Sequence, residues 1–270
     1  TPSNTLTTLL LGGMSQVDAM RRARPTFVTS WLGNNDVLAA ALEGDPSLMT
    51  PVDTFEEYHE RVSQAIAGSG AMGVVLIGVL DVRIAPVLQP GLYYWLADSL
   101  GLAPKEVSDD CAPRDELGEL NPMSMNTVSW LAFRDTMIDV VSCDPSAKYV
   151  MPFAEMDAIG ARVTAFNNIL RVETQDRNWV YVAPGDVVQS ALNSAGSGRH
   201  NLLRRCEGLN NTLTEEAMVN FFNARCPHPN APNYFGSLVT YDGIHMSAAA
   251  HQLIANAIAL QVNSKYELDL

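Results

Sequence analysis

Apolar runs mark three predicted strands along this chain. Residues 26–32 (TFVTSWL) are rich in β-branched and aromatic side chains, which predicts a buried strand. Residues 72–80 (MGVVLIGVL) are apolar without interruption, which is typical of a strand covered on both faces, as in parallel sheets. Residues 179–183 (WVYVA) predict a third strand.

Segments with helical periodicity alternate with these runs. The pattern predicts helices over residues 15–24, 53–67 and 215–223, and it makes Pro152 the first residue of a long helix. Ser247 is a suitable N-cap for the last helix, whose apolar face comprises Leu253, Ile254, Ala257, Ile258 and Val262. Strands that alternate with helices indicate an α/β fold with a parallel sheet.

Two segments do not follow this alternation of strands and helices. Residues 84–150 and 190–235 are predicted as irregular insertions, the first of them lid-like, within a single domain of residues 1–270 that is incomplete at its N-terminus. Aromatic and methionine side chains are frequent in the first insertion. They either line a pocket for acyl or aryl groups or form a small core of their own: Tyr93, Tyr94, Trp95, Met123, Met125, Trp130 and Phe133.

The composition is that of a folded, acidic protein. Hydrophobic residues make up 47% of the 270 residues and charged residues 17%, which is enough apolar material for a full core. The formal net charge of -13, with no Lys/Arg cluster to offset it, predicts repulsion from nucleic acid and from anionic membranes. The longest apolar run, residues 71–80, is far shorter than the roughly 20 residues of a membrane-spanning helix.

The four cysteines indicate the redox environment. None lies in a CxxC pair, which argues against zinc ribbons and thioredoxin-like sites. Two disulfides would indicate an oxidising compartment, and four buried free thiols are the alternative. Of the three pairings, we favour Cys111–Cys143 and Cys206–Cys226 because each pair brackets one irregular segment. We therefore expect a secreted, periplasmic or cell-surface protein, with a bacterial source as the working hypothesis.

Two polar segments carry the candidate chemistry. Gly33-Asn34-Asn35-Asp36 follows the first predicted strand, and open α/β sheets place their sites at the carboxyl ends of strands. Asp242-Gly243-Ile244-His245 precedes the last helix. An Asp three residues before a His can turn its carboxylate onto the imidazole and stabilise the imidazolium, as a general base of acyl transfer requires. The alternatives are an Asx turn that caps a helix and a loop with a helix-capping acid.

Together and in this order, the two segments resemble the GxND and DxxH blocks of the SGNH/GDSL hydrolase family. The stretch SAAAHQLIANAI after them is similar to the closing helix of that family, and GVLDV at residues 78–82 looks like the end of the strand between the blocks. The resemblance covers the sheet-forming parts of the chain. It implies a three-layer α/β/α, flavodoxin-like sandwich that hydrolyses carboxylic esters through an acyl-enzyme.

The resemblance also implies a role for each matched residue. Asn35, in the loop that starts at Gly33, would donate its side-chain amide to the oxyanion of the tetrahedral intermediate. His245 would take the proton from the nucleophilic serine and pass it to the leaving alkoxide, and Asp242 would orient His245. The implied partner is a small-molecule ester, and no metal or organic cofactor is implied.

The nucleophile itself is missing from the pattern. The GDS block of the family is absent, and so is the second block, whose Gly lends an N–H to the oxyanion hole. Both would lie upstream of Gly33, which only 32 residues precede. Ser69 and Ser197 lie in flexible GSG contexts on the wrong side of the sheet order. Since the chain starts at Thr1, we expect the nucleophilic Ser on an N-terminal segment, which either is a nicked or separate chain that stays bound or is part of a longer precursor.

Other residues and functions have weaker support. His59 is expected on a solvated helix face and His251 in helix packing, and His228 beside Cys226 lacks the second ligand pair of a metal site. A non-catalytic carbohydrate- or ligand-binding module of the same fold remains an alternative function. A nucleotide-binding doubly wound protein would need a Gly-rich phosphate loop between a strand and a helix, which the sequence lacks.

Overall fold

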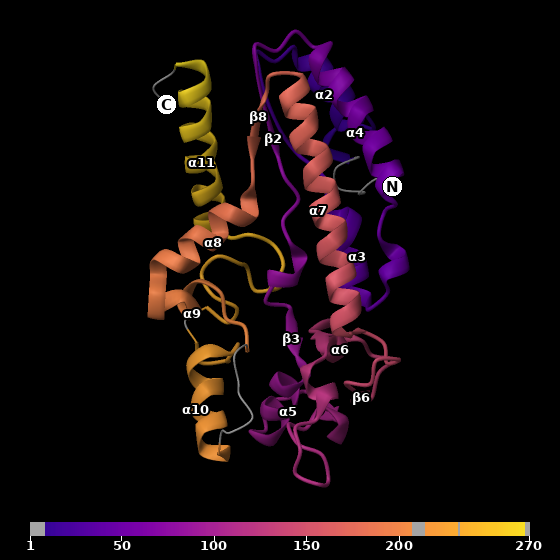
Figure 1. Ribbon diagram of the computed structural model, residues 1–270, viewed down its shortest axis with the longest axis vertical. Coiled ribbons are helices and arrows are strands. Elements are labelled where there is room, and N and C mark those ends of the chain that lie inside the picture. Colours follow the sequence, from indigo (N-terminus) through magenta and orange to yellow (C-terminus); the bar gives the residue numbers. More distant parts are fainter. Residues whose placement is uncertain (1–8, 207–213, 232, 268–270) are drawn as a thin grey trace.

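The chain has a mixed α/β structure in a computed structural model that describes residues 9–206, 214–231 and 233–267 (Figure 1). The helices are α2 (Gln16–Ala23), α3 (Asn35–Glu43), α4 (Val52–Ala67), α5 (Gly91–Ser99), α6 (Leu131–Arg134), α7 (Phe153–Asp176), α8 (Pro184–Ala195), α9 (Arg199–Leu202), α10 (Glu215–Arg225) and α11 (Ala248–Tyr266). The strands are β1 (Phe27–Trp31), β2 (Gly73–Ile77), β3 (Leu88–Pro90), β4 (Glu106–Val107), β5 (Thr127–Ser129), β6 (Val140–Val141), β7 (Val150–Met151) and β8 (Val180–Val182).

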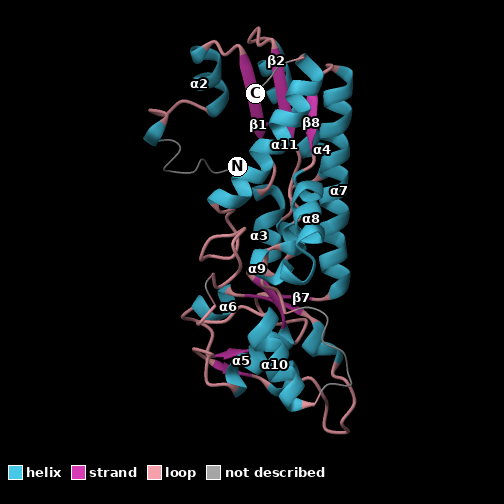
Figure 2. Cartoon of the chain, turned by 90° about the vertical axis from the view of Figure 1, so that its left-hand side faces the viewer, coloured by secondary structure: helices cyan, strands magenta, loops and turns pink. Residues whose placement is uncertain are grey.

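A short parallel sheet with the strand order β1-β2-β8 lies in the upper half of the molecule (Figure 2). Its strands are the three that the apolar runs predict. The register pairs Phe27 with Gly73 and Trp31 with Ile77, so β1 and β2 begin and end at the same level. The loops that leave their carboxyl ends therefore start side by side.

Helices cover both faces of this sheet, which explains the uninterrupted apolar run of β2. Val74 and Leu76 lie in the core shared with α4 and α7, and Val75 and Ile77 lie in the core shared with α11. Figure 1 shows α11 on one side of β2 and β8 and α7 on the other. The parallel sheet and the α/β class are thus confirmed.

The two predicted insertions share one core in the lower half of Figure 1. The first insertion contributes the antiparallel sheet β3-β5-β7 and α5, and the second contributes α10. Tyr93 of α5 stacks on Phe222 of α10 with ring centroids 5.6 Å apart, and its hydroxyl is 2.8 Å from that of Tyr234. Tyr93 and Tyr94 are fully buried in this core. The aromatic residues of the first insertion therefore contribute to a core, separate from that of the parallel sheet, that both insertions share.

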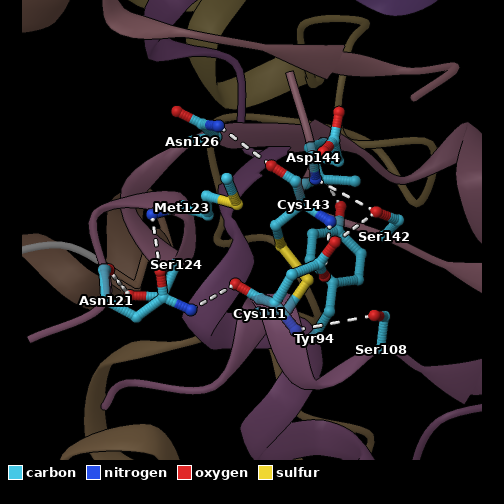
Figure 3. Close-up of a disulfide and its surroundings, with 12 residues drawn as sticks. Tyr94, Ser108, Cys111, Asn121, Met123, Ser124, Asn126, Ser142, Cys143 and Asp144 are labelled. Atoms are coloured by element: carbon cyan, nitrogen blue, oxygen red, sulfur yellow. Dashed lines mark hydrogen bonds between the residues drawn. A yellow bond between two sulfur atoms is a disulfide. The ribbon is translucent and has the colours of Figure 1, made fainter. Parts of the chain in front are cut away.

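Both disulfides form, in the pairing favoured from the sequence: Cys111–Cys143 and Cys206–Cys226. Figure 3 shows the first of them, where the Asn126 amide donates to the Cys143 carbonyl at 2.9 Å. Within the described ranges, no helix is long and apolar enough to cross a bilayer. The two disulfides are compatible with a secreted protein.

Two local expectations were wrong, and two helices were not predicted. Pro152 is the N-cap of α7 and not its first residue. Helices α3 and α8 were not predicted, although α3 begins inside the predicted turn at Asn35. His59 is not solvated: it is buried, with its ring 4.3 Å from that of Phe55. Burial lowers the pKa of His59 to about 4, against the opposing charge of Asp36, so this helix face carries a neutral core histidine.

Removing the Cys111–Cys143 bridge should destabilise the protein. Both sulfur-bearing residues are fully buried, and the bridge closes a sequence separation of 32 residues. We expect Cys111→Ala with Cys143→Ala to lower the free energy of unfolding by about 2–4 kcal/mol in denaturant titrations. Gln252→Ala on the exposed surface of α11 is the control and should stay within about 0.5 kcal/mol of the parent. A loss no larger than that of the control would contradict the structural role of this bridge.

Candidate active site

The loop between β1 and α3 is held tightly against the end of β2. Gly33 has a φ of +111°, and a Cβ there would lie 2.7 Å from Val79 Cγ2, so only glycine fits. The Asn34 side-chain oxygen accepts a hydrogen bond from the Leu80 backbone N–H at 2.8 Å. The Asp36 carboxylate accepts from Thr50 Oγ1 at 2.7 Å. The loop is thus tied both to the segment after β2 and to the segment before α4.

Asn35 occupies a different position from its neighbours. It is the first residue of α3 and is exposed, and its side-chain amide makes no hydrogen bond within the described part of the chain. Asn34 precedes the helix without a side-chain capping bond, so the Asx-cap alternative does not describe this turn. The Asn35 amide is therefore available to a ligand at the rim of the sheet.

The second segment forms a closed turn between residues 239 and 247. Thr240 N–H donates to the His245 carbonyl at 2.8 Å, and Gly243, with a φ of +70°, accepts from Val87 N–H at 3.1 Å. The N-cap of α11 is Ser247, as predicted, whose hydroxyl accepts from Ala250 N–H at 3.3 Å. Because Ser247 caps the helix, the Asp242 carboxylate does not serve as the cap and accepts hydrogen bonds within its own loop.

Asp242 and His245 form a hydrogen-bonded pair. His245 Nδ1 lies 2.5 Å from one Asp242 carboxylate oxygen. The other oxygen accepts from Thr240 Oγ1 at 2.7 Å and from the N–H groups of Ile244 and His245, each at 2.9 Å. Partial burial acts to raise the pKa of the Asp242 carboxyl, but these hydrogen bonds, first of all that from His245, hold the pKa well below its ordinary value.

An ionised Asp242 that accepts from Nδ1 fixes the tautomer of the His245 ring. Nδ1 carries the proton, and Nε2 of the neutral ring is the acceptor. The His245 side chain is 75% exposed, so Nε2 can reach a ligand. This is the arrangement that a general base requires.

Asn35 and His245 line the same cavity, which has a volume of about 340 Å³. The cavity lies where the loops after β1 and β2 meet the loop before α11. Most of its other lining residues are apolar, among them Leu38, Leu80, Val188, Leu238, Ile244 and Met246. Such a lining suits an apolar group placed beside two polar ones.

Three aromatic or charged lining residues were not proposed as site residues from the sequence: Trp31, Asp81 and His251. His251 Nδ1 lies 2.9 Å from the Ser247 carbonyl, and its ring centroid is 6.3 Å from that of Trp31. Asp81 is paired with Arg83 at 2.7 Å. His251 lies in the first turn of α11, six residues after His245, and Trp31 and Asp81 lie in the segments quoted above for the first strand and for residues 78–82.

The described residues that line the cavity include no serine, threonine or cysteine. Ser69 lies beyond α4, at the amino end of β2, and donates to the Ile66 carbonyl at 2.7 Å. Ser197 lies in the turn between α8 and α9. Neither residue lines the cavity.

One group in the described part of the chain has the spacing of metal ligands: Asp110, Cys111 and Cys143. Its two sulfur atoms are joined in a disulfide and therefore offer no thiolate. His228, weighed as a ligand from the sequence, has its Nδ1 accepting from Asn230 N–H at 3.2 Å.

The Asp242 carboxyl should titrate well below about 3.9, the ordinary value of an Asp. Replacing His245 by Ala removes one donor, so we expect the Asp242 pKa to rise in that variant, as measured by ¹³C NMR of the carboxyl carbon. His251→Ala removes a ring from the same cavity without touching Asp242 and is the matched control.

The lowered pKa of Asp242 determines how the stability of the protein depends on pH. The Asp242 carboxylate contributes stability that is present above its unfolded-state pKa and is lost as the pH falls through the folded-state value. An Asp242 titration at or above about 3.9 in the parent protein would contradict the pairing.

No family model, curated protein or solved structure matches this chain. The resemblance to SGNH/GDSL hydrolases therefore depends on the matched residues and on the geometry of this cavity.

Proposed function

We propose that the protein is a serine ester hydrolase of the SGNH/GDSL type, with His245 as the general base, Asp242 as its partner and Asn35 as an oxyanion donor. The observation that carries the proposal is the convergence of Asn35 and the hydrogen-bonded Asp242–His245 pair on one cavity. These side chains come from loops about 200 residues apart in a chain of 270. A purely structural role for either loop would not require its polar groups to face the same space.

Each group has a defined step in this proposal. His245 Nε2 takes the proton of a serine hydroxyl as the serine oxygen attacks the ester carbonyl, and it later gives that proton to the leaving alkoxide. Asp242 stabilises the imidazolium that forms between these two events. The Asn35 amide donates to the oxyanion, which is typically worth about 3–4 kcal/mol of transition-state stabilisation. Gly33 lets the loop that carries Asn35 approach Val79.

We propose that the nucleophilic serine comes from an N-terminal segment outside the 270 residues of this chain. The open edge of β1 supports this part of the proposal, since β1 pairs with β2 alone among the described strands (Figure 2). An unpaired strand edge presents free N–H and C=O groups that another strand can bind. A parallel strand added there would end at the rim that holds Asn35, because parallel strands share their carboxyl edge.

The same features support the finer fold assignment. A parallel sheet with helices on both faces and a cavity at the carboxyl ends of its strands is what a flavodoxin-like sandwich of this family requires. The apolar lining of the cavity favours esters that carry an apolar group. The two disulfides favour action outside the cytoplasm.

One observation favours the second candidate function, a non-catalytic carbohydrate- or ligand-binding module. The described lining of the cavity has no hydroxyl or thiol that could act as a nucleophile. Such a module would bind its ligand through Asn35 and His245 without turnover. Hydrolytic activity of the purified protein distinguishes the two functions.

Replacing the proposed groups should nearly abolish ester hydrolysis. We expect His245→Ala to lower kcat by about 10²–10⁴-fold on p-nitrophenyl esters, because proton transfer loses its base. Asn35→Ala should lower kcat by about 10²–10³-fold through loss of an oxyanion donor. Circular dichroism should show that both variants keep the parent fold, since both side chains are exposed.

His251→Ala is the matched control for these variants. His251 lines the same cavity and is bound to the Ser247 carbonyl, away from Asp242. We expect this variant to keep most of its activity. If His251→Ala lost turnover while His245→Ala or Asn35→Ala retained it, the roles assigned above would be wrong.

A further inference from the structure

The chain leaves the parallel ladder directly after β2, and one side chain of α7 binds it there. Gly78 N–H donates to the Val182 carbonyl of β8 at 2.9 Å. At the next residue, Val79 N–H donates to Asn167 Oδ1 at 2.7 Å, and Asn167 Nδ2 donates to the Val79 carbonyl at 2.9 Å. One amide side chain thus binds both polar backbone groups of Val79, as a neighbouring strand does within a sheet.

These two bonds satisfy backbone groups that are cut off from water. Val79 is only 1% exposed, and a buried N–H or C=O without a partner costs about as much free energy as a lost hydrogen bond. The residue before it leaves room for the amide, since a Cβ at Gly78 would lie 2.7 Å from Asn167 Oδ1. The end of β2 is therefore built to receive a side chain from α7.

The packing of α7 holds Asn167 in a fixed position. Val163 and Leu170, one turn to either side of it, are buried in the core of the parallel sheet. Phe166 is fully buried and stacks on Phe55 of α4, with ring centroids 3.7 Å apart. Figure 1 shows this long helix alongside β2. The Asn167 amide is therefore placed by α7 and not by the loop that it binds.

Val79 connects this fixed point to the loop that carries Asn35. Its Cγ2 would lie 2.7 Å from a Cβ at Gly33, so Val79 packs directly against the turn after β1. The following residue, Leu80, donates its N–H to Asn34 Oδ1 at 2.8 Å. A displacement of Val79 would therefore disturb the two contacts that place the residues directly before Asn35.

We propose that Asn167 is a positioning residue of the oxyanion site: its amide fixes Val79 and Leu80, and these two residues fix the loop from Gly33 to Asn35. Asn167 does not line the cavity, so it acts through this loop and not on the substrate. The catalytic half of this inference rests on the proposed hydrolase function, and the fixing of the loop does not.

The fixing of the loop is tested by hydrogen exchange of the Leu80 amide, followed by NMR of the purified protein. In Asn167→Ala we expect the Leu80 N–H to exchange at least about tenfold faster than in the parent, because the residue before it loses both hydrogen bonds. The Thr240 N–H, which donates to the His245 carbonyl in the other loop of the site, should keep its rate.

Asn168→Ala is the matched control for this variant. Asn168 is the next residue of α7, is exposed, and accepts a hydrogen bond from Arg171 at 2.9 Å. It should leave the Leu80 rate as it is in the parent. A Leu80 rate in Asn167→Ala equal to that of the control, or an equal acceleration at Thr240, would overturn the fixing of the loop.

A second variant serves if Asn167→Ala does not fold. Asn167→Asp keeps an acceptor for the Val79 N–H and loses the donor to the Val79 carbonyl. We expect a smaller acceleration of Leu80 exchange in the same direction, again without a change at Thr240. An unchanged Leu80 rate in a folded Asn167→Asp protein would equally overturn the proposal.

The catalytic half is tested by a double-mutant cycle with Asn35, measured as hydrolysis of p-nitrophenyl butanoate. Asn167→Ala should lower kcat by about 10–100-fold, because a small displacement of a catalytic group is costly. In the Asn35→Ala background the same change should lower kcat by less than about twofold, since the donor that it positions is already absent. The pH profile of kcat/KM should stay that of the parent, because the Asp242–His245 pair lies in the other loop.

The outcomes separate this inference from the proposed function. An equal loss of kcat in both backgrounds, or an unchanged kcat in Asn167→Ala, would overturn the catalytic half and leave the hydrolase function standing. A parent protein that hydrolyses no ester would overturn the hydrolase function and the catalytic half with it, and the Leu80 exchange rate would then decide whether Asn167 fixes the loop.

Discussion

The parallel register of β1 with β2 is the constraint on which the site depends. Because Trp31 pairs with Ile77, the two strands end together, and the loops that follow them leave the sheet at one level. Gly33 then approaches Val79 more closely than any residue with a Cβ could. The Asn34 side-chain oxygen accepts a hydrogen bond from the Leu80 N–H, and this bond holds the two loops together. Asn35 is the next residue and the first of α3, so strand pairing places it in the lining of the cavity.

The helix α11 brings the other half of the site to the same rim. Its apolar face lies against β8 and β2, with Val262 in the core formed by Val75, Ile77 and Val180. Ser247 begins the helix, and the turn before it is fastened to Val87 through Gly243. His245 is thereby held next to the cavity, and Asp242 reaches its Nδ1 without leaving that turn. The pair therefore needs no support from distant side chains, which is why a four-residue motif can predict it.

Features set by local sequence were predictable, and features set by tertiary contact were not. The three strands of the parallel sheet, the Ser247 cap and both disulfides follow from apolar runs, capping chemistry and cysteine spacing. His59 is buried with its ring against that of Phe55, which the glutamates around it in the sequence do not reveal. The shared core of the two insertions also joins segments that are distant in sequence. Periodicity within one window carries no information about such contacts.

Activity-based labelling with a fluorophosphonate, followed by mass spectrometry of the adduct, tests the central claim most directly. The probe reacts with a serine only when a base and an oxyanion site activate it. The account predicts an adduct on a serine outside the 270 residues of this chain, on polypeptide that purifies with it, and loss of that adduct in His245→Ala. An adduct on a serine of this chain away from the cavity, or undiminished labelling after His245→Ala, would contradict the claim that Asn35 and His245 face an external nucleophile.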